Sequence, residues 1–269
     1  MSGTHVDALV RHEDLGGGVA RVTLNRPDKR NAMNRAARGA LLDALDTCEG
    51  TAKVVVLTGA GPAFCAGMDL KEAAEDGPHA DAVLPGRRTN WLTVQERIHD
   101  HPAIVIAAVN GAALGGGLTL INSSDLAIAA EDAPIGMPEV GFGIYPGLAG
   151  PSTQLRLGHK RAAWMVLTAD RIDGRTAAEW GLVNQAVPAD RLEDAVTALA
   201  RGIARHDAVT LEWSKRALHQ IPAHISDWSA ALRYGESVRA QIQVRSDVLD
   251  DGHAMHQRAV HGASAEVPR

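Results

Sequence analysis

The middle of the chain reads Val109-Asn110-Gly111-Ala112-Ala113-Leu114-Gly115-Gly116-Gly117-Leu118-Thr119-Leu120. An earlier stretch of similar type reads Leu57-Thr58-Gly59-Ala60-Gly61-Pro62-Ala63-Phe64-Cys65-Ala66-Gly67-Met68-Asp69-Leu70-Lys71. Each stretch begins where a continuous apolar run ends, and such runs are typical of strands that are buried on both faces. The order of strand, glycine-rich turn and helix therefore occurs twice, at residues 54–72 and 104–123.

The rest of the chain alternates further apolar runs with segments of helical periodicity. We expect strands at 19–24, 53–58, 104–109, 126–130 and 183–187. We expect helices at 37–48, 91–99, 160–167, 176–180, 191–204, 209–220 and 229–249. Residues 71–90 are polar without a clear period and are predicted to form a loop, and the chain before residue 19 is predicted to be a loose tail. This alternation predicts an α/β fold in which helices cover both faces of the sheet.

Composition and charge limit the classes of partner. The 269 residues are 45% apolar, which is enough for one large domain with a helical appendage. The net charge of −5, the lack of a long basic run and the 3% aromatic content predict no nucleic-acid binding. The first residues are polar, and no apolar stretch approaches the roughly 20 residues of a membrane helix. We therefore expect a cytoplasmic protein with no membrane partner, in which Cys48 and Cys65 are buried free thiols.

The two glycine-rich turns can bind a negatively charged oxygen. Glycine allows left-handed backbone angles, and a turn that opens into a helix points free N–H groups outward. Two such turns facing each other could donate to one oxygen and form an oxyanion hole. The spacing of a phosphate-binding Walker loop is absent, and Phe64 stands where a dinucleotide fingerprint needs its third glycine.

An ordered set of motifs resembles that of the crotonase (enoyl-CoA hydratase/isomerase) superfamily and spans roughly residues 19 to 220. The motifs are Asn25-Arg26-Pro27-Asp28-Lys29-Arg30-Asn31-Ala32, the two turns, Gly136-Met137-Pro138-Glu139, Gly143-Ile144-Tyr145-Pro146-Gly147 and Ala177-Ala178-Glu179-Trp180-Gly181-Leu182-Val183-Asn184. The resemblance implies a crotonase-type spiral of repeated ββα units over residues 1–204. It also implies a C-terminal helical oligomerisation or lid region over 205–269, and a homotrimer or hexamer.

The resemblance further implies an acyl-CoA thioester as the substrate. The backbone N–H groups of Met68 and Gly116 would hold the thioester oxygen as an enolate forms. Other positions would line the path of the substrate, namely Arg26, Lys29, Ala32, Ala66, Gly67, Asp69, Leu70 and Tyr145. Coenzyme A would be part of the substrate, and no metal or redox cofactor is implied.

The acid–base residues bear on the reaction. Hydratases that resemble this chain carry two glutamates; Glu139 matches the second, whereas Thr119 stands at the position of the first. A hydroxyl group can orient water or substrate but is a poor proton shuttle near pH 7. Thr119 and Gly147 also replace the aspartates of dienoyl-CoA isomerases, so we do not expect that activity. A single glutamate suffices to move a proton from C2 to C4 of a 3-enoyl-CoA. The sequence thus favours an enoyl-CoA isomerase or hydratase.

Two alternatives stay open. The hydroxycinnamoyl-CoA hydratase-lyase resembles this chain at Met68, Thr119 and Glu139, but Ala73-Ala74 stands where that enzyme has a phenol-binding tyrosine, and Tyr234 is a possible match to its other one. A catalytically weak homologue that binds a CoA ligand or RNA is the second alternative. Its RNA-binding form should carry a basic exposed helix, which the acidic net charge disfavours.

Overall fold

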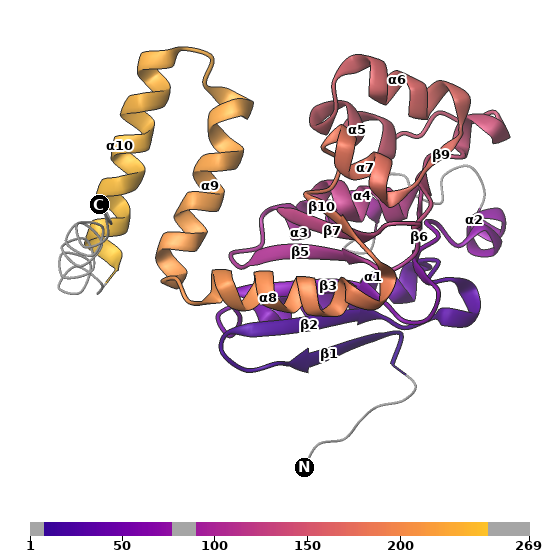
Figure 1. Cartoon of the computed structure of the whole chain (residues 1–269), viewed down its shortest axis with the longest axis horizontal. Coiled ribbons are helices and arrows are strands. Elements are labelled where there is room, and N and C mark those ends of the chain that lie inside the picture. Colours follow the sequence, from indigo (N-terminus) through magenta and orange to yellow (C-terminus); the bar gives the residue numbers. More distant parts are fainter. Residues whose placement is uncertain (1–7, 77–89, 247–269) are drawn as a thin grey trace, which may run out of the picture. The chain divides into compact units, whose positions relative to one another are not determined.

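The structure is a computed structural model that describes residues 8–76 and 90–246. It divides into two compact units, Met1–Arg205 and His206–Arg269. The first unit contains both sheets and most of the helices (Figure 1).

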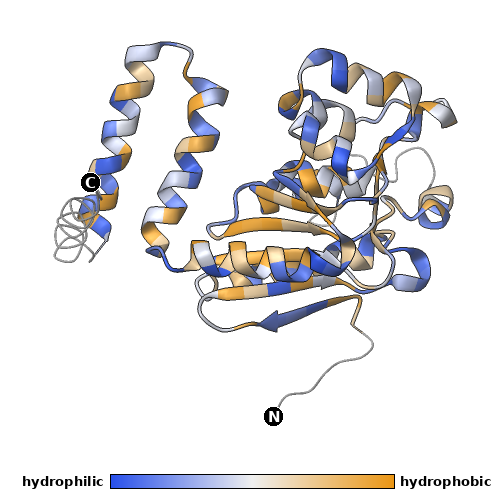
Figure 2. Ribbon diagram, in the orientation of Figure 1, coloured by the Kyte–Doolittle hydropathy of each residue, from blue (hydrophilic) through white to orange (hydrophobic). Residues whose placement is uncertain are grey.

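A six-stranded sheet forms the centre of the first unit, in the order β1-β2-β3-β5-β7-β10. Its strands are β1 (Val10–Asp14), β2 (Val19–Leu24), β3 (Val54–Gly59), β5 (Ile104–Val109), β7 (Leu126–Ala130) and β10 (Gln185–Val187). The edge strand β1 is antiparallel to β2, and the other pairs are parallel. Every residue of β5 is buried, as its apolar run predicts, and Figure 2 shows the inner strands as mainly hydrophobic.

A second, smaller sheet has the order β4-β6-β8-β9. Its strands are β4 (Ala63–Cys65), β6 (Ala112–Leu114), β8 (Ile135–Gly136) and β9 (Arg171–Ile172). Each of the first three follows one strand of the large sheet along the chain, and β4, β6 and β8 pair in the same order as β3, β5 and β7. The chain therefore advances by repeated ββα units, and the predicted fold class is confirmed.

The helical elements of the first unit fall into two groups along the chain. One group consists of η1 (Pro27–Lys29), α1 (Arg35–Cys48), α2 (Leu70–Asp76), α3 (Trp91–His99) and α4 (Gly116–Ser123). The later elements are η3 (Glu139–Phe142), α5 (Ala149–Arg156), α6 (His159–Thr168), α7 (Gly174–Trp180), η4 (Ala189–Arg191) and α8 (Leu192–Ala204). Helix α8 lies along β2, β3, β5 and β7, against which it buries Leu192, Val196, Ala200 and Ala204 at four-residue spacing.

The second unit contains a pair of packed helices, α9 (Ala208–His224) and α10 (Trp228–Arg245). Asp207 and Asp227 cap their amino ends, each accepting a hydrogen bond from a backbone N–H three residues on. Lys215 and Val238 are the buried residues of these two helices.

Some expectations were wrong at the level of elements. Residues 71–76 of the predicted loop belong to α2, because Asp69 accepts the Lys71 N–H and the following residues favour helix. The remainder of that loop, 77–89, lies outside the described residues. The predicted tail contains β1, a polar edge strand with four of five residues exposed, which has no apolar alternation to reveal it.

Candidate active site

The two glycine-rich turns lie side by side because the strands that carry them are neighbours. Strands β3 and β5 are paired, and so are the short strands β4 and β6 that follow them. Gly67 has a φ of +91°, and a Cβ atom there would lie 2.7 Å from the Leu114 carbonyl oxygen and 3.1 Å from the Gly116 nitrogen. Only glycine allows so close a contact. The contact places Gly67, the residue before Met68, against Gly116, the first residue of α4.

The N–H groups of Met68 and Gly116 are available at this junction. Met68 pairs with Met33, such that Met33 donates to the Gly67 carbonyl at 2.8 Å and Asp69 donates to the Met33 carbonyl at 3.3 Å. The N–H of Met68 itself therefore points away from Met33. Gly116 is the first residue of α4, where an N–H has no partner within the helix. We find no acceptor for either N–H within residues 8–76 and 90–246.

The carboxyl group of Glu139 lies above the second turn. A Cβ atom on Gly115 would lie 2.5 Å from Glu139 Oε1, and Gly115 has a φ of +51° that disfavours any side chain. The Gly115 N–H donates to the Gly136 carbonyl at 2.9 Å, which ties the turn to the strand preceding Glu139. Glu139 Oε2 is buried and has no hydrogen-bond partner within the described residues. Burial raises the pKa of the Glu139 carboxyl group above its ordinary value.

The sequence neighbours of Glu139 differ in their exposure. Gly136 and Met137 are buried. Val140 and Phe142, by contrast, are exposed on η3. A carboxyl group with a raised pKa and an oxygen that lacks a partner among the described residues is suited to accept and release a proton.

Thr119 is buried in the first turn of α4. Its hydroxyl group donates to the Gly116 carbonyl at 2.6 Å, so its proton is engaged and its oxygen remains an acceptor. The side chain thereby also holds the helical turn that presents the Gly116 N–H.

Arg26 and Asp69 form an ion pair between Arg26 Nη1 and Asp69 Oδ2 at 2.9 Å, with both side chains largely buried. The same nitrogen donates to the Ala32 carbonyl. Partial burial raises the pKa of Asp69, but the hydrogen bond and charge of Arg26 outweigh that effect and hold it below its ordinary value. Lys29 is exposed on η1, with its Nζ 4.0 Å from Asp28.

The remaining predicted substrate contacts differ in exposure. Ala66 is half-buried, and its N–H donates to the Arg30 carbonyl at 2.9 Å. Met68 and Leu70 expose their side chains, and Tyr145 is 56% exposed with its hydroxyl group 3.4 Å from Gln154 Nε2. Burial raises the pKa of the Cys65 thiol, next to the first turn, to about 12, so this free cysteine stays protonated.

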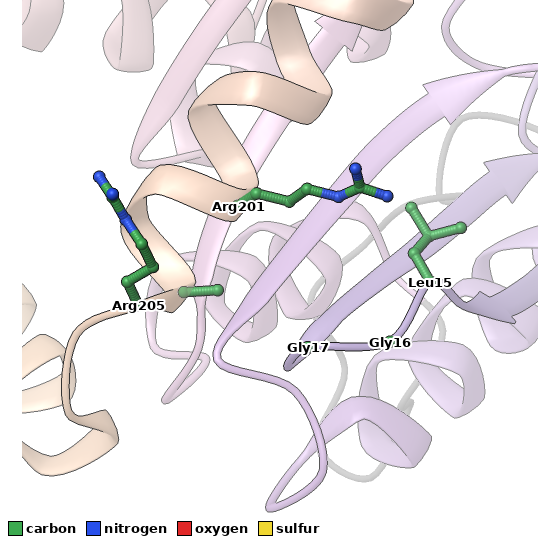
Figure 3. A pocket seen from close by; sticks show the side chains of 6 residues that line it. Leu15, Gly16, Gly17, Arg201 and Arg205 are labelled. Atoms are coloured by element: carbon green, nitrogen blue, oxygen red, sulfur yellow. The ribbon is translucent and has the colours of Figure 1, made fainter.

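A hollow of about 440 Å³ lies away from these residues, where the turn before β2 meets the end of α8. Its lining consists of Leu15, Gly16, Gly17, Arg201, Ala204 and Arg205. Figure 3 shows Arg201 extending toward Leu15 and Arg205 pointing to the other side. This lining holds two cations but no carboxylate. The glycine turns lie elsewhere, because they follow the opposite ends of β3 and β5.

Sequence reasoning missed two side chains that support the turns. Trp91 lies against Gly116, and Arg38 lies over the Trp91 ring. Neither stands in a motif, and no pattern in the sequence distinguishes them from ordinary helix residues. In the part of the chain that the structure describes, no cluster of three or more histidine, cysteine, aspartate or glutamate side chains could hold a metal ion. Among the same residues we find no helix with the length and apolar character of a membrane span.

Solved structures share this fold. An enoyl-CoA hydratase from Mycobacterium smegmatis superposes with a TM-score of 0.85 at 29% identity, covering 93% of this chain and 96% of that one. An enoyl-CoA hydratase from Bacillus anthracis gives 0.84 at 31% identity, with 93% and 96% covered. The ββα spiral is thus of the crotonase type.

The sequence itself matches the model of the enoyl-CoA hydratase/isomerase family over residues 14–239. The chain therefore belongs to this family of enzymes. A hydroxycinnamoyl-CoA hydratase-lyase from Pseudomonas fluorescens is 37% identical over 209 residues, which cover 75% of each chain. A 2,3-dehydroadipyl-CoA hydratase from Escherichia coli is 37% identical over 238 residues, covering 87% of this chain and 89% of the relative.

Proposed function

We propose that this chain is an enoyl-CoA isomerase or hydratase in which Glu139 is the single acid–base group. The observation that carries the proposal is the half-buried Glu139 carboxyl group above Gly115, which has a raised pKa and whose buried Oε2 has no partner among the described residues. This group lies beside the two turns, whose Met68 and Gly116 N–H groups have no acceptor within residues 8–76 and 90–246. Acid–base chemistry and oxyanion stabilisation can therefore occur at one place.

The thioester oxygen of the substrate accepts hydrogen bonds from the N–H groups of Met68 and Gly116. These donors stabilise the negative charge that develops on that oxygen. In isomerisation, the Glu139 carboxylate takes a proton from C2 of a 3-enoyl thioester to give the dienolate. It returns this proton to C4, which leaves the 2-enoyl thioester and restores the carboxylate. In hydration, Glu139 instead takes a proton from a water whose oxygen adds to C3 of a 2-enoyl thioester. It then returns that proton to C2 of the enolate, which gives the 3-hydroxyacyl thioester and restores the carboxylate. Thr119 contributes an acceptor for that water.

The nucleotide end of the substrate lies near η1 in this proposal. Lys29 offers an exposed ammonium group to the phosphates. Arg26 is bound to Asp69 and Ala32, so its contribution is to fix the segment between η1 and the first turn. Ala66, Gly67, Leu70 and Tyr145 line the pantetheine and acyl path.

A second candidate is a hydroxycinnamoyl-CoA hydratase-lyase activity. It is favoured by the relative of that name, which is 37% identical over 209 residues. Against it stands Ala73-Ala74 in α2, which offers no phenolic hydroxyl for a bound phenol.

The test is a mass-spectrometric panel of 3-enoyl-CoA, 2-enoyl-CoA and 4-hydroxycinnamoyl-CoA with separation of isomers. We expect 3-enoyl-CoA to change to the 2-enoyl isomer, or 2-enoyl-CoA to gain one water. We expect Glu139→Gln to lose about 10²–10⁴-fold in rate, the range typical of a general acid–base group. Glu179→Gln, at an exposed glutamate of α7, is the matched control and should keep the wild-type rate.

Release of an aromatic aldehyde and acetyl-CoA would select the second candidate. Equal turnover by wild type and Glu139→Gln would remove Glu139 from the mechanism. A wild-type protein that turns over none of the three thioesters would contradict the proposed activity.

We also propose a homotrimer or a dimer of trimers. The second unit exposes large apolar side chains, including Leu218, Trp228 and Val244, which a further copy of the chain would cover.

A further inference from the structure

A buried arginine in α1 contacts the supports of both glycine turns. The side chain of Arg38 is 3% exposed. Its Nη1 donates to the Met33 carbonyl at 3.1 Å, and its Nη2 lies 3.8 Å from Glu72 Oε2. The guanidinium carbon lies 5.9 Å from the centre of the Trp91 ring. A guanidinium group is costly to bury and needs such partners, whereas an apolar side chain would fill the space without that cost.

One set of these contacts leads to the first turn. Met33 accepts from Arg38 and also forms the bridge with Met68, through hydrogen bonds to Gly67 and Asp69. The direction of the Met68 N–H therefore depends on where the Met33 backbone lies. Glu72 adds a second tie, because its Oε2 accepts the Arg35 N–H at 2.8 Å and so joins α2 to the start of α1.

The other contact leads to the second turn. Trp91 is 3% exposed, and its ring edge occupies the position that a side chain on Gly116 would take, since a Cβ atom there would lie 2.5 Å from Trp91 Cη2. Asn90 caps α3 by accepting the Thr93 N–H at 2.7 Å, which fixes the first residue of that helix, Trp91. The ring thus packs directly behind the backbone that carries the Gly116 N–H.

We propose that Arg38 is a positioning residue that sets the spacing of the two oxyanion N–H donors, through Met33 on one side and Trp91 on the other. The inference rests on the proposed function, because it assumes that both donors serve one thioester oxygen. Donors of an oxyanion hole must be held to within about 0.5 Å, and the side chains that lock them act without touching the substrate. The charge of Arg38 lies 3.8 Å from the Glu72 carboxyl group.

The test compares full-length wild type with Arg38→Met, Arg38→Lys and Trp91→Phe. Arg97→Met is the matched control, because Arg97 also joins α3 to α1, through Asp46 and Glu49, at the end of α1 remote from the turns. Each protein is measured for kcat and KM with the thioester that wild type turns over fastest. Infrared spectroscopy then follows the ¹³C-labelled carbonyl of bound butyryl-CoA, or of 3-(4-hydroxyphenyl)propionyl-CoA if only the aromatic thioester reacts.

We expect Arg38→Met to lower kcat by about 10- to 100-fold while KM stays within about threefold, the pattern of lost transition-state stabilisation. The carbonyl frequency of the bound analogue should shift to lower values in wild type and shift less in Arg38→Met and Trp91→Phe. Arg38→Lys should recover part of the lost kcat and part of the lost carbonyl shift. Arg97→Met should match wild type in kcat and in carbonyl shift, even if its melting temperature is lower.

Full kcat and a full carbonyl shift in Arg38→Met would overturn the role of Arg38. If Arg38→Met does not fold, full kcat and a full carbonyl shift in both Trp91→Phe and Arg38→Lys would overturn the proposal instead. Active wild type with an unshifted carbonyl would overturn the positioning role while leaving the proposed activity in place. Wild type with neither turnover nor a carbonyl shift would overturn both.

Discussion

Burial of Glu139 links catalysis to stability. Its folded-state pKa is raised, so the folded protein holds the proton more tightly than the unfolded chain does. Stability is therefore greatest below the ordinary pKa of glutamate and decreases as pH rises through the raised value. Glu139→Gln removes the ionisation. We therefore expect the melting temperature of Glu139→Gln minus that of wild type, measured by calorimetry, to be larger at pH 8 than at pH 4. An equal difference at both pH values would mean that Glu139 titrates normally in the folded protein.

The same carboxyl group predicts the pH dependence of the rate. In the proposed mechanism the carboxylate is the base, so kcat/KM should rise with pH and level off above the raised pKa of Glu139. The midpoint should lie above the ordinary glutamate value of 4.5. A profile of initial rates in buffers of constant ionic strength measures it. A midpoint at or below 4.5 would show that burial does not control this group in the active enzyme.

Gly115 is the backbone position that leaves room for that carboxyl group. Its φ of +51° and ψ of −111° suit glycine alone, and an added methyl group would meet Glu139 Oε1 at 2.5 Å. We expect Gly115→Ala to lose about 1–3 kcal/mol of stability from backbone strain and, in addition, at least about tenfold in kcat as Glu139 is displaced. Gly50→Ala is the control, with a φ of +73° and no atom within 4 Å of the added Cβ, so it carries strain alone. Equal kcat values in the two variants would show that the Gly115 contact does not position Glu139.

At the scale of elements, the junction between β4 and α2 depends on Asp69. This residue immediately precedes α2, accepts the Lys71 N–H, pairs with Arg26 and lies next to Met68. We expect Asp69→Asn to lose about 1–3 kcal/mol at neutral pH, because Arg26 is left largely buried without its counter-ion. The loss should disappear as pH falls through the lowered pKa of Asp69, where the wild-type carboxylate is itself protonated.

Denaturant unfolding of Asp69→Asn at two pH values measures this effect. Asp132→Asn is the control, since Asp132 pairs with Arg175 on the surface, where such pairs contribute little to stability. Similar losses in the two variants would contradict a special role for the Arg26–Asp69 pair.

Element length decides how much of the fold the sequence predicts. Strands β2, β3, β5 and β7 are five or six residues long and carry apolar runs, so the sequence predicts where they lie. Strands β8 and β9 have two residues each, too few for any periodicity, and they pair only because the long strands bring them together. The helix α5 was also missed, since its sequence Ala149–Arg156 mixes glycine, proline and serine.

The candidate site likewise contains residues that the sequence predicts and residues that only the packing reveals. Met68, Gly116 and Glu139 stand in motifs whose order along the chain is itself informative. Arg38 and Trp91 act through contacts between α1, α3 and α4 that depend on the packing of three helices. The raised pKa of Glu139 is likewise a result of packing, because burial and not the neighbouring sequence sets it.

At the scale of the whole molecule, the second unit exposes large apolar side chains on α9 and α10. Leu218 of α9 and Trp228 of α10 are both about three-quarters exposed, and Val244 is 84% exposed, although such side chains are normally buried. A homotrimer or hexamer would cover them. We expect wild type to sediment at micromolar concentration as one of these assemblies, and Leu218→Glu/Trp228→Glu to sediment as smaller species, because charges at an apolar interface are costly to desolvate. Gln220→Glu, at an exposed position of α9, should leave the assembly intact. A monomeric wild type, or a double variant that assembles as wild type does, would show that these side chains are not an interface between copies of the chain.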